Sequence, residues 1–160
     1  MNVWGTIHGT RAFLPLLRAN PDGGHFAVTA SMSSLHVTPG IGGYTVTKFA
    51  VAAFAETLAA ELAEEGADVG VTLLCPGPVQ SRLGASHRNR PGHLPGGAMV
   101  DSDLEQTEEG KQLRWIAAEE VANTLLHAIR RGDLYAFTHG EWAPVVQARH
   151  ERIAEAFQRA

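Results

Sequence analysis

The spacing of apolar and polar residues along the chain predicts alternating helices and short strands. From Asn2 to about Ala19 the apolar spacing suits a largely buried helix, which Pro15 should kink or end early. After a run of turn-forming residues, His25–Ser31 is short and apolar and predicts a buried strand. From about Tyr44 to Glu65 the spacing is helical again, and Gly66 is its expected stop.

The second half of the chain repeats this alternation after a long polar stretch. Val69–Cys75 predicts a second buried strand. Residues 81–111 are polar and broken by prolines and glycines, so we expect a long flexible insertion. Ala117–Arg131 predicts an amphipathic helix, Leu134–Thr138 a short third strand and Ala143–Phe157 a terminal helix.

Alternating strands and helices of these lengths predict a single α/β domain over residues 1–160, built on a parallel sheet. Three strands are few for such a sheet, which usually has about five or six. The chain also opens on a half-apolar helix with no strand before it. We therefore expect an incomplete sheet with flanking helices.

Composition narrows the class of protein. The 160 residues are 44% hydrophobic and 19% charged, as in a globular domain, and the net charge of −4 argues against nucleic-acid binding. The single cysteine, Cys75, can form no internal disulfide and is expected to be packed rather than nucleophilic. No stretch approaches about 18 apolar residues and no secretion signal opens the chain, so we expect a cytoplasmic protein without membrane spans.

Tyr44 and Lys48 are the central candidates for chemistry. Four residues apart at the start of a helix, they lie on one face, one turn from each other. A phenol is a poor acid or base at neutral pH, and a nearby ammonium favours its ionised form. Such pairs are also common on solvated helix faces, so the pair alone is a weak signal.

The residues around the Tyr44–Lys48 pair strengthen the case for a catalytic site. Ser31 ends one predicted strand, and the run Pro76-Gly77-Pro78-Val79-Gln80-Ser81 follows the next. Ligands of α/β sheets bind beyond the carboxyl ends of the strands, so hydroxyl, phenol, ammonium and backbone amides should meet in one crevice. Taken singly, Ser31 reads as a turn serine or helix cap and Pro76-Gly77 as a plain turn.

Together these segments resemble the short-chain dehydrogenase/reductase family. Ala30-Ser31-Met32-Ser33, Tyr44-x-x-x-Lys48 and Pro76-Gly77-Pro78-Val79 match its motifs in order, and Ser31 stands thirteen positions before Tyr44, as in that family. Asn2, in Asn2-Val3-Trp4-Gly5, matches its catalytic asparagine. The resemblance implies a Rossmann-type fold and reversible hydride transfer between NAD or NADP and an alcohol or carbonyl substrate.

The resemblance also implies a role for each matched residue. Tyr44 would be the general acid and base and would also contact the cofactor. Ser31 would polarise the substrate oxygen, and Lys48 would hold the nicotinamide ribose. Asn2 would hold a water that relays protons to Lys48. Pro76 and Gly77 would shape the turn under the nicotinamide, Val79 would contact its carboxamide, and Ser81 stands where the family often has threonine. Residues 81–111 would form the substrate lid.

One family feature is missing: no G-x-G-x-x-G run is present, and Gly40-Ile41-Gly42-Gly43 reads as a hinge into Tyr44. Dinucleotide affinity should therefore be poor. We expect the chain to be the catalytic, C-terminal half of a dehydrogenase, from a truncated gene or a misplaced start at Met1. The alternative is a catalytically silent remnant or interaction module. The choice between NAD and NADP, and the substrate, stay open.

Other classes of site are disfavoured. The eight histidines are scattered without an H-E-x-x-H run, so no metal site is expected. Ser31 lacks the G-x-S-x-G elbow of serine hydrolases. The alanine-rich face of the Tyr44 helix is a candidate surface for a homodimer or homotetramer, as the resemblance implies; the alternative is packing within one subunit.

Overall fold

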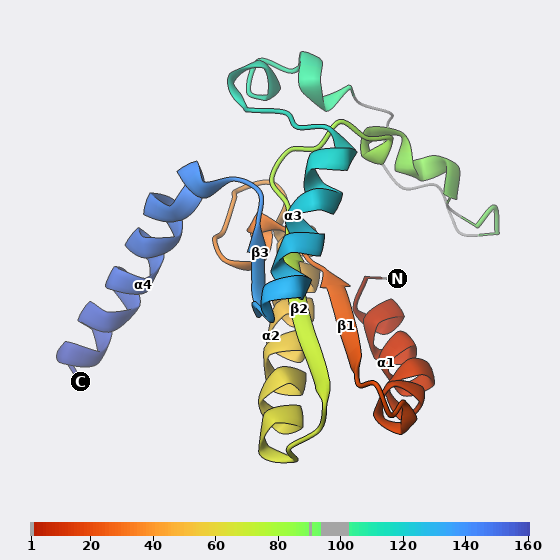
Figure 1. The fold of residues 1–160 in the computed structure, drawn as a ribbon. Coiled ribbons are helices and arrows are strands. Elements are labelled where there is room, and N and C mark those ends of the chain that lie inside the picture. Colours follow the sequence, from red (N-terminus) through yellow and green to blue (C-terminus); the bar gives the residue numbers. More distant parts are fainter. Residues whose placement is uncertain (1, 90, 94–102) are drawn as a thin grey trace.

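The computed structural model describes residues 2–89, 91–93 and 103–160. Helices and strands follow in the predicted order (Figure 1). Their bounds are α1 (Asn2–Ala19), β1 (Gly24–Thr29), α2 (Gly42–Glu64), β2 (Val69–Cys75), α3 (Ala118–Arg131), β3 (Tyr135–Phe137) and α4 (Ala143–Gln158). The described part of the chain therefore keeps the alternation that the hydrophobic pattern predicts.

The three strands form one parallel sheet in the order β1-β2-β3. Gly24 pairs with Val69 at one end of the first ladder and Thr29 with Leu74 at the other. On the far side of β2, Leu73 and Cys75 pair with the two ends of β3. Parallel pairing brings the carboxyl ends of all three strands to one edge of the sheet, and the predicted α/β, Rossmann-type class is confirmed.

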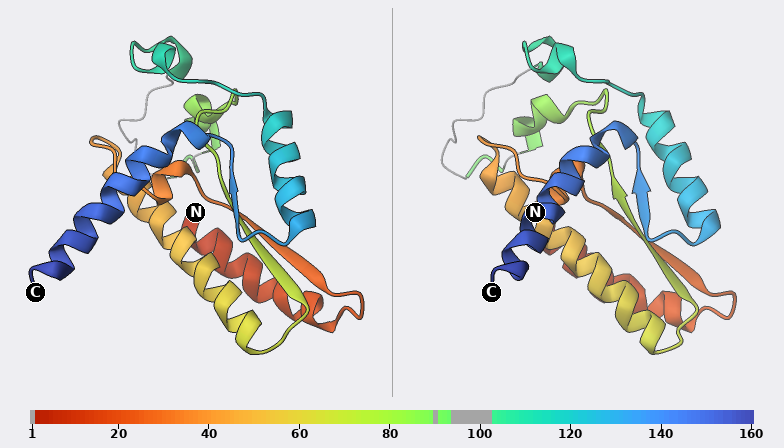
Figure 2. Two further views of the ribbon diagram at one scale, coloured as in Figure 1. Left: turned by 60° about the vertical axis from the view of Figure 1, so that its left-hand side comes forward. Right: turned by 90° about the vertical axis from the view of Figure 1, so that its left-hand side faces the viewer.

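Helices lie on both sides of the sheet. Figure 2 shows α1 and α2 together on one side of the strands and α3 on the other. The larger core lies on the first side, where Leu62 of α2 and Leu73 of β2 are almost fully buried. A smaller core on the other side joins Leu74 of β2 to Ala128 of α3. β2 is covered on both faces, which explains its nearly continuous apolar sequence.

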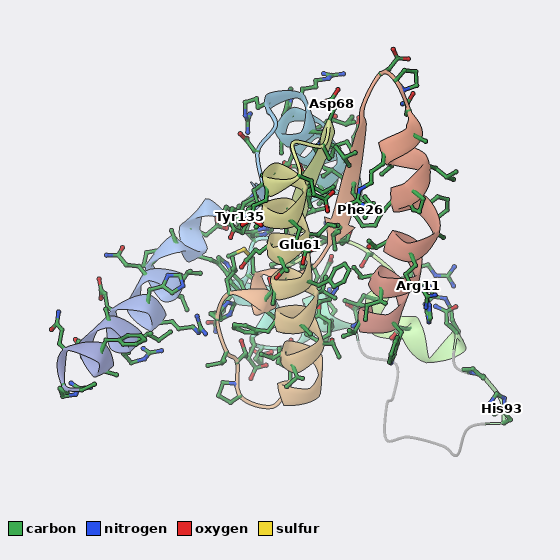
Figure 3. All side chains as sticks on the ribbon, turned by 90° about the horizontal axis from the view of Figure 1, so that it is seen from below. Arg11, Phe26, Glu61, Asp68, His93 and Tyr135 are labelled. Atoms are coloured by element: carbon green, nitrogen blue, oxygen red, sulfur yellow. The ribbon has the colours of Figure 1, made fainter. Side chains whose placement is uncertain are left out.

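The prediction that β1 is a buried strand is wrong in part. Within β1 only Val28 is buried, and Ala27 and Thr29 are exposed. Side chains alternate along a strand, so Phe26 and Val28 both belong to the core with α1 and α2; Figure 3 labels Phe26. The opposite face is open because α3 packs on β2 and β3. A short apolar run cannot show whether the second face of its strand is covered.

Helix ends also differ from the prediction. The first helix does not end early at Pro15 but continues to Ala19. Proline removes the hydrogen bond to the carbonyl of Arg11, but both residues lie on the exposed side of α1, where water can pair with that carbonyl. α2 begins two residues before Tyr44, so Gly42 belongs to its first turn, and Gly66 takes the left-handed conformation (φ +65°) expected of a helix stop.

The predicted flexible insertion at 81–111 is described only in part. Two short 3₁₀ helices fall inside its described part, Leu83–Asn89 and Leu104–Gln106, and a third, Gly110–Gln112, runs one residue past its end. Residue 90 and residues 94–102 lie outside the described residues, so the lid stays a prediction. Farther along, α4 extends away from the sheet and ends in the C-terminus (Figure 1). Among the described residues no helix has both the length and the apolar character that crossing a membrane requires.

Candidate active site

Lys48 and Tyr44 meet at the carboxyl end of β1. Both lie on the first turns of α2, and the Lys48 Nζ is 5.6 Å from the centre of the Tyr44 ring. The same Nζ donates a hydrogen bond to the backbone carbonyl of Thr29, the last residue of β1, at 3.2 Å. Burial lowers the pKa of the Lys48 ammonium below its ordinary value. Lys48 is therefore anchored at the observed end of β1, two residues before the predicted end at Ser31, and Tyr44 lies beside Lys48.

Ser31 stands two residues beyond β1 and caps the 3₁₀ helix η1 (Met32–Ser34). Its Oγ accepts a hydrogen bond from the Ser33 backbone N–H at 3.1 Å. The serine is thus a helix cap, as one reading of the sequence had it, and capping uses only an oxygen lone pair. The Ser31 O–H is left to donate to another oxygen. Because η1 packs against α2, this hydroxyl lies on an element next to the one that carries Tyr44.

Asn2, on the first turn of α1, is tied to the turn of α2 that lies between Tyr44 and Lys48. Its Nδ2 donates to Thr47 Oγ1 at 3.1 Å, and that hydroxyl donates to the Tyr44 carbonyl at 2.8 Å. Two helices far apart in sequence are therefore joined at the candidate site. The joining residue, Thr47, was not predicted, although a threonine hydroxyl often bonds a carbonyl one turn earlier on its own helix.

The run from Pro76 to Ser81 follows β2 at the same edge of the sheet. It is joined to the serine segment, because the Met32 N–H donates to the Pro76 carbonyl at 2.9 Å. Ser81 is exposed, and its Oγ accepts from the Leu83 N–H at 3.4 Å. The two predicted strand-end segments thus lie side by side, as the parallel sheet requires.

Val79 forms an isolated parallel bridge with Ile116. The bonds of this bridge run from the Ile116 N–H to the Pro78 carbonyl and from the Gln80 N–H to the Ile116 carbonyl. Val79's own N–H and C=O therefore point away from Ile116, and within the described part of the chain neither forms a hydrogen bond. A free donor beside a free acceptor matches the two hydrogen-bonding groups of a carboxamide.

Cys75 lies beneath these segments as the last residue of β2. It is fully buried, and burial raises the pKa of its thiol. Its Sγ is 3.5 Å from the Ser34 Oγ, which also donates to the Ser31 carbonyl at 2.5 Å. A thiol held protonated and shielded in this way is a packing group, which confirms the prediction for Cys75.

Three contributors to the site carried no usable sequence signal. The carbonyl of Thr29 holds Lys48, and a backbone atom is independent of residue type. His139, at the carboxyl end of β3, packs its ring against Gly77 and is 1% exposed. Thr138, beside it, accepts a hydrogen bond from the Gly77 N–H at 3.2 Å. Their place after the third strand is the only hint that the sequence offers.

The described residues fit the nicotinamide half of a dinucleotide. Lys48 retains donors beyond its single bond to Thr29, enough for ribose hydroxyls, and Val79 offers a donor and acceptor pair for the carboxamide. For a pyrophosphate, the glycine-rich run before a helix is missing from the sequence. Among the described residues, no three metal-ligating side chains of His, Cys, Asp or Glu gather in one place.

Known proteins are similar to this chain in sequence. The family model described as short chain dehydrogenase matches residues 1–92, which include every predicted site residue. The 1-deoxy-11-beta-hydroxypentalenate dehydrogenase of Streptomyces avermitilis is 30% identical over 144 residues, covering 88% of this chain and 45% of its own length.

Solved structures agree with the fold. A short chain dehydrogenase/reductase from Burkholderia phymatum, in complex with NAD, matches with a TM-score of 0.82 and 32% identity over 97% of this chain and 57% of its own. A short chain dehydrogenase from Burkholderia cenocepacia, in complex with NADP, matches with a TM-score of 0.64 and 23% identity over 99% and 53%. The chain thus spans about half the length of these proteins.

Proposed function

This chain belongs to the short chain dehydrogenase family, and on that premise we propose that it carries the catalytic residues of an NAD(P)-dependent oxidoreductase interconverting an alcohol and a carbonyl compound. The observation that carries the proposal is Lys48, which lies 5.6 Å from the Tyr44 ring centre while bonded to the last carbonyl of β1. That contact joins the candidate proton donor to the strand end where Ser31 follows.

Each residue has a task in this reaction. A bound nicotinamide cofactor accepts or supplies the hydride. Tyr44 takes the hydroxyl proton when the alcohol is oxidised and returns it when the carbonyl is reduced. Ser31 donates its free O–H to the same substrate oxygen, which stabilises negative charge there. Lys48 stabilises the Tyr44 phenolate and holds the ribose hydroxyls.

The site is completed by Asn2 and by the run from Pro76 to Ser81 that follows β2. Asn2 holds a water from which Lys48 recovers protons, and its bond to Thr47 fixes the amide beside that turn of α2. The N–H and C=O of Val79, which form no hydrogen bond within the described part of the chain, hold the carboxamide, while Pro76 and Gly77 shape the turn and Ser81 takes the place where the family often has threonine. The complexes of family members with NAD and with NADP support a nicotinamide cofactor, with either form.

A fluorescence titration of the chain with NADH and NADPH tests cofactor binding. A folded chain that binds neither would favour the alternative, a catalytically silent remnant or interaction module, which the missing G-x-G-x-x-G run supports. With a binding chain, oxidation of a panel of secondary alcohols is followed by the absorbance of the reduced nicotinamide.

Substitution of the tyrosine separates proton transfer from binding. Tyr44→Phe should abolish turnover and keep cofactor affinity within about twofold, because only the hydroxyl is lost. The matched control is Tyr135→Phe, which removes the other tyrosine hydroxyl of the chain, bonded to Glu56 at 3.0 Å. Equal turnover by Tyr44→Phe and the parent chain would refute the role of Tyr44.

Self-association is also part of the proposal. Ala52 and Ala55 of α2 pack inside the chain, so part of its alanine-rich face belongs to the core of one subunit. Large apolar side chains nevertheless stay exposed on α1 and α2, and they support a homodimer or homotetramer through these helices. They are Trp4, Phe13, Leu16 and Val46. Size-exclusion chromatography that gives only monomer would contradict this assignment.

A further inference from the structure

His139 is a fully satisfied histidine at the carboxyl end of β3. The residue is 1% exposed, and it comes two positions after β3, at the sheet edge where the candidate site lies. The ring Nε2 is 2.9 Å from the Arg114 carbonyl oxygen, and Nδ1 is 2.7 Å from Thr138 Oγ1. A carbonyl oxygen only accepts, so Nε2 carries the hydrogen, and in the neutral ring Nδ1 accepts from the Thr138 hydroxyl.

Thr138 extends this chain of hydrogen bonds to the loop after β2. Its Oγ1 accepts from the Gly77 N–H at 3.2 Å and lies 2.7 Å from Nδ1 of His139, to which the hydroxyl donates when the ring is neutral. The orientation of this hydroxyl is therefore set from both sides. Gly77 is thus held by a threonine whose geometry depends on the imidazole.

The imidazole also sets the space that residue 77 can occupy. A Cβ added to Gly77 would lie 2.6 Å from both Cγ and Nδ1 of His139. Gly77 is not in the left-handed region, so its backbone conformation is one that alanine adopts freely. The need for glycine here comes from the ring packed on it, not from the backbone.

A third contact reaches the other side of the loop. His139 donates to the Arg114 carbonyl, and two residues later Ile116 forms the bridge with Val79. Arg114 is itself held, since its Nη2 donates to the Thr138 carbonyl at 2.7 Å and its Nε to Glu141 at 2.9 Å. One side chain thus contacts both segments that flank the N–H and C=O of Val79.

We propose that His139 is a positioning residue for the nicotinamide-binding loop 76–79: its ring fixes Gly77 through Thr138 and fixes the strand partner of Val79 through Arg114. The inference rests on the proposed function, because the loop matters only if Val79 contacts a cofactor. His139 itself touches neither substrate nor cofactor in this proposal.

The test combines amide exchange with cofactor affinity. In the chain without ligand, ¹⁵N NMR should show the Nε2–H tautomer of His139 and a protected Gly77 amide. His139→Leu fills the space but forms no hydrogen bond, so we expect exchange at Gly77 to rise about tenfold and the Kd for NADH to rise about fivefold to tenfold. His139→Gln, which keeps a donor for the Arg114 carbonyl, should restore part of both.

His25 supplies a matched control at the opposite end of the strands. Its ring packs on Gly70, where an added Cβ would lie 2.5 Å from Nδ1, and its Nε2 is 2.8 Å from Thr72 Oγ1. His25→Leu removes the same kind of contact far from the loop. It should lower stability without changing Gly77 exchange or NADH affinity, which separates positioning from general support of the fold.

A double-mutant cycle tests the steric part. Gly77→Ala should weaken NADH binding several-fold in the parent chain and have little further effect in a His139→Ala background, because the collision is gone. Equal effects in both backgrounds would overturn the packing argument.

The outcomes distinguish the two proposals. If the parent chain binds neither NADH nor NADPH, the proposed function fails, and the exchange rate of Gly77 still decides whether His139 positions the loop. Faster Gly77 exchange with unchanged NADH affinity would overturn the link to the cofactor. If the Gly77 amide exchanges at an unchanged rate in His139→Leu, or if the Val71 amide of β2 shows an equal rise, the proposal that His139 positions the loop would be overturned.

Discussion

Replacing Lys48 with methionine should separate function from stability. The Lys48 ammonium has one hydrogen bond, to the Thr29 carbonyl at 3.2 Å, and burial lowers its pKa, so the fold disfavours the charge that it holds. Such an arrangement is expected of a group kept for binding rather than for stability. Lys48→Met should therefore weaken the cofactor complex and leave the fold intact.

The magnitude follows from three contributions. Losing the hydrogen bond costs about 1 kcal/mol, and burying the methionine end group returns about 0.8 kcal/mol. These nearly cancel, and the remaining contribution is the relief of partial desolvation of the ammonium, so we expect Lys48→Met to be more stable by up to about 1 kcal/mol. Losing charge-assisted bonds to ribose hydroxyls should weaken NADH binding about 10-fold to 100-fold.

Urea unfolding followed by circular dichroism measures the first quantity, and a fluorescence titration with NADH measures the second. The control is Lys111→Met, which removes the other lysine of the chain, an exposed one paired with Glu108 at 2.8 Å. That change should move stability by no more than about 0.5 kcal/mol and leave affinity unaltered. A Lys48→Met chain destabilised by more than about 1 kcal/mol, or binding NADH as tightly as the parent, would refute the reasoning.

The same experiment has a pH dependence of known sign. The folded chain releases the Lys48 proton at a lower pH than the unfolded chain, whose pKa is the ordinary 10.5. Between the lowered pKa and 10.5 the unfolded state binds more protons, so the stability of the parent chain rises with pH relative to that of Lys48→Met. The advantage of Lys48→Met should therefore shrink as the pH approaches 10.5.

Three further substitutions test the scaffold. Thr72→Val should lower the free energy of unfolding by about 1–3 kcal/mol, because the buried hydroxyl bonds both His25 and the Asp133 carbonyl; urea unfolding measures it, and no loss would contradict it. Burial lowers the pKa of His25, so stability should fall as the pH drops through about 6.5, and His25→Gln should flatten that fall in urea unfolding at about pH 5.5 and 7.5; an unchanged slope would count against it. Gly132→Ala should cost about 1 kcal/mol in thermal unfolding at the left-handed stop of α3 (φ +71°), and an equal Tm would refute the strain.

Much of the fold was predictable because local chemistry sets it. The period of the apolar residues gave α2 and β2 close to their observed bounds, and glycine stopped α2 at Gly66 because only glycine adopts φ > 0 at little cost. The failures were contextual. Of the two effects expected of Pro15, a kink or an early end, the early end did not occur, since the carbonyl that Pro15 leaves unpaired lies on an exposed side of the helix. β1 is apolar enough to be buried on both faces, but the face opposite α1 and α2 is open because α3 packs on β2 and β3.

Part of the candidate site was also predictable from local geometry. The spacing of Tyr44 and Lys48 fixes their neighbourhood, because the helix sets which side chains share a face. Order along the chain and parallel pairing placed Ser31 and Pro76 at one edge of the sheet. Both inferences use only regular backbone geometry.

The amino-acid sequence by itself predicted the succession of helices and strands and a parallel sheet, because these follow from backbone periodicity and residue type, and it supplied the candidate site residues through a family resemblance. Only the tertiary structure decided that the Thr29 carbonyl holds Lys48, that Thr47 ties Asn2 to Tyr44, and that His139 packs on Gly77. The partners in each of these contacts come from different elements. Such contacts depend on how whole helices and strands pack, and that arrangement is fixed by the sum of all core contacts rather than by any local pattern.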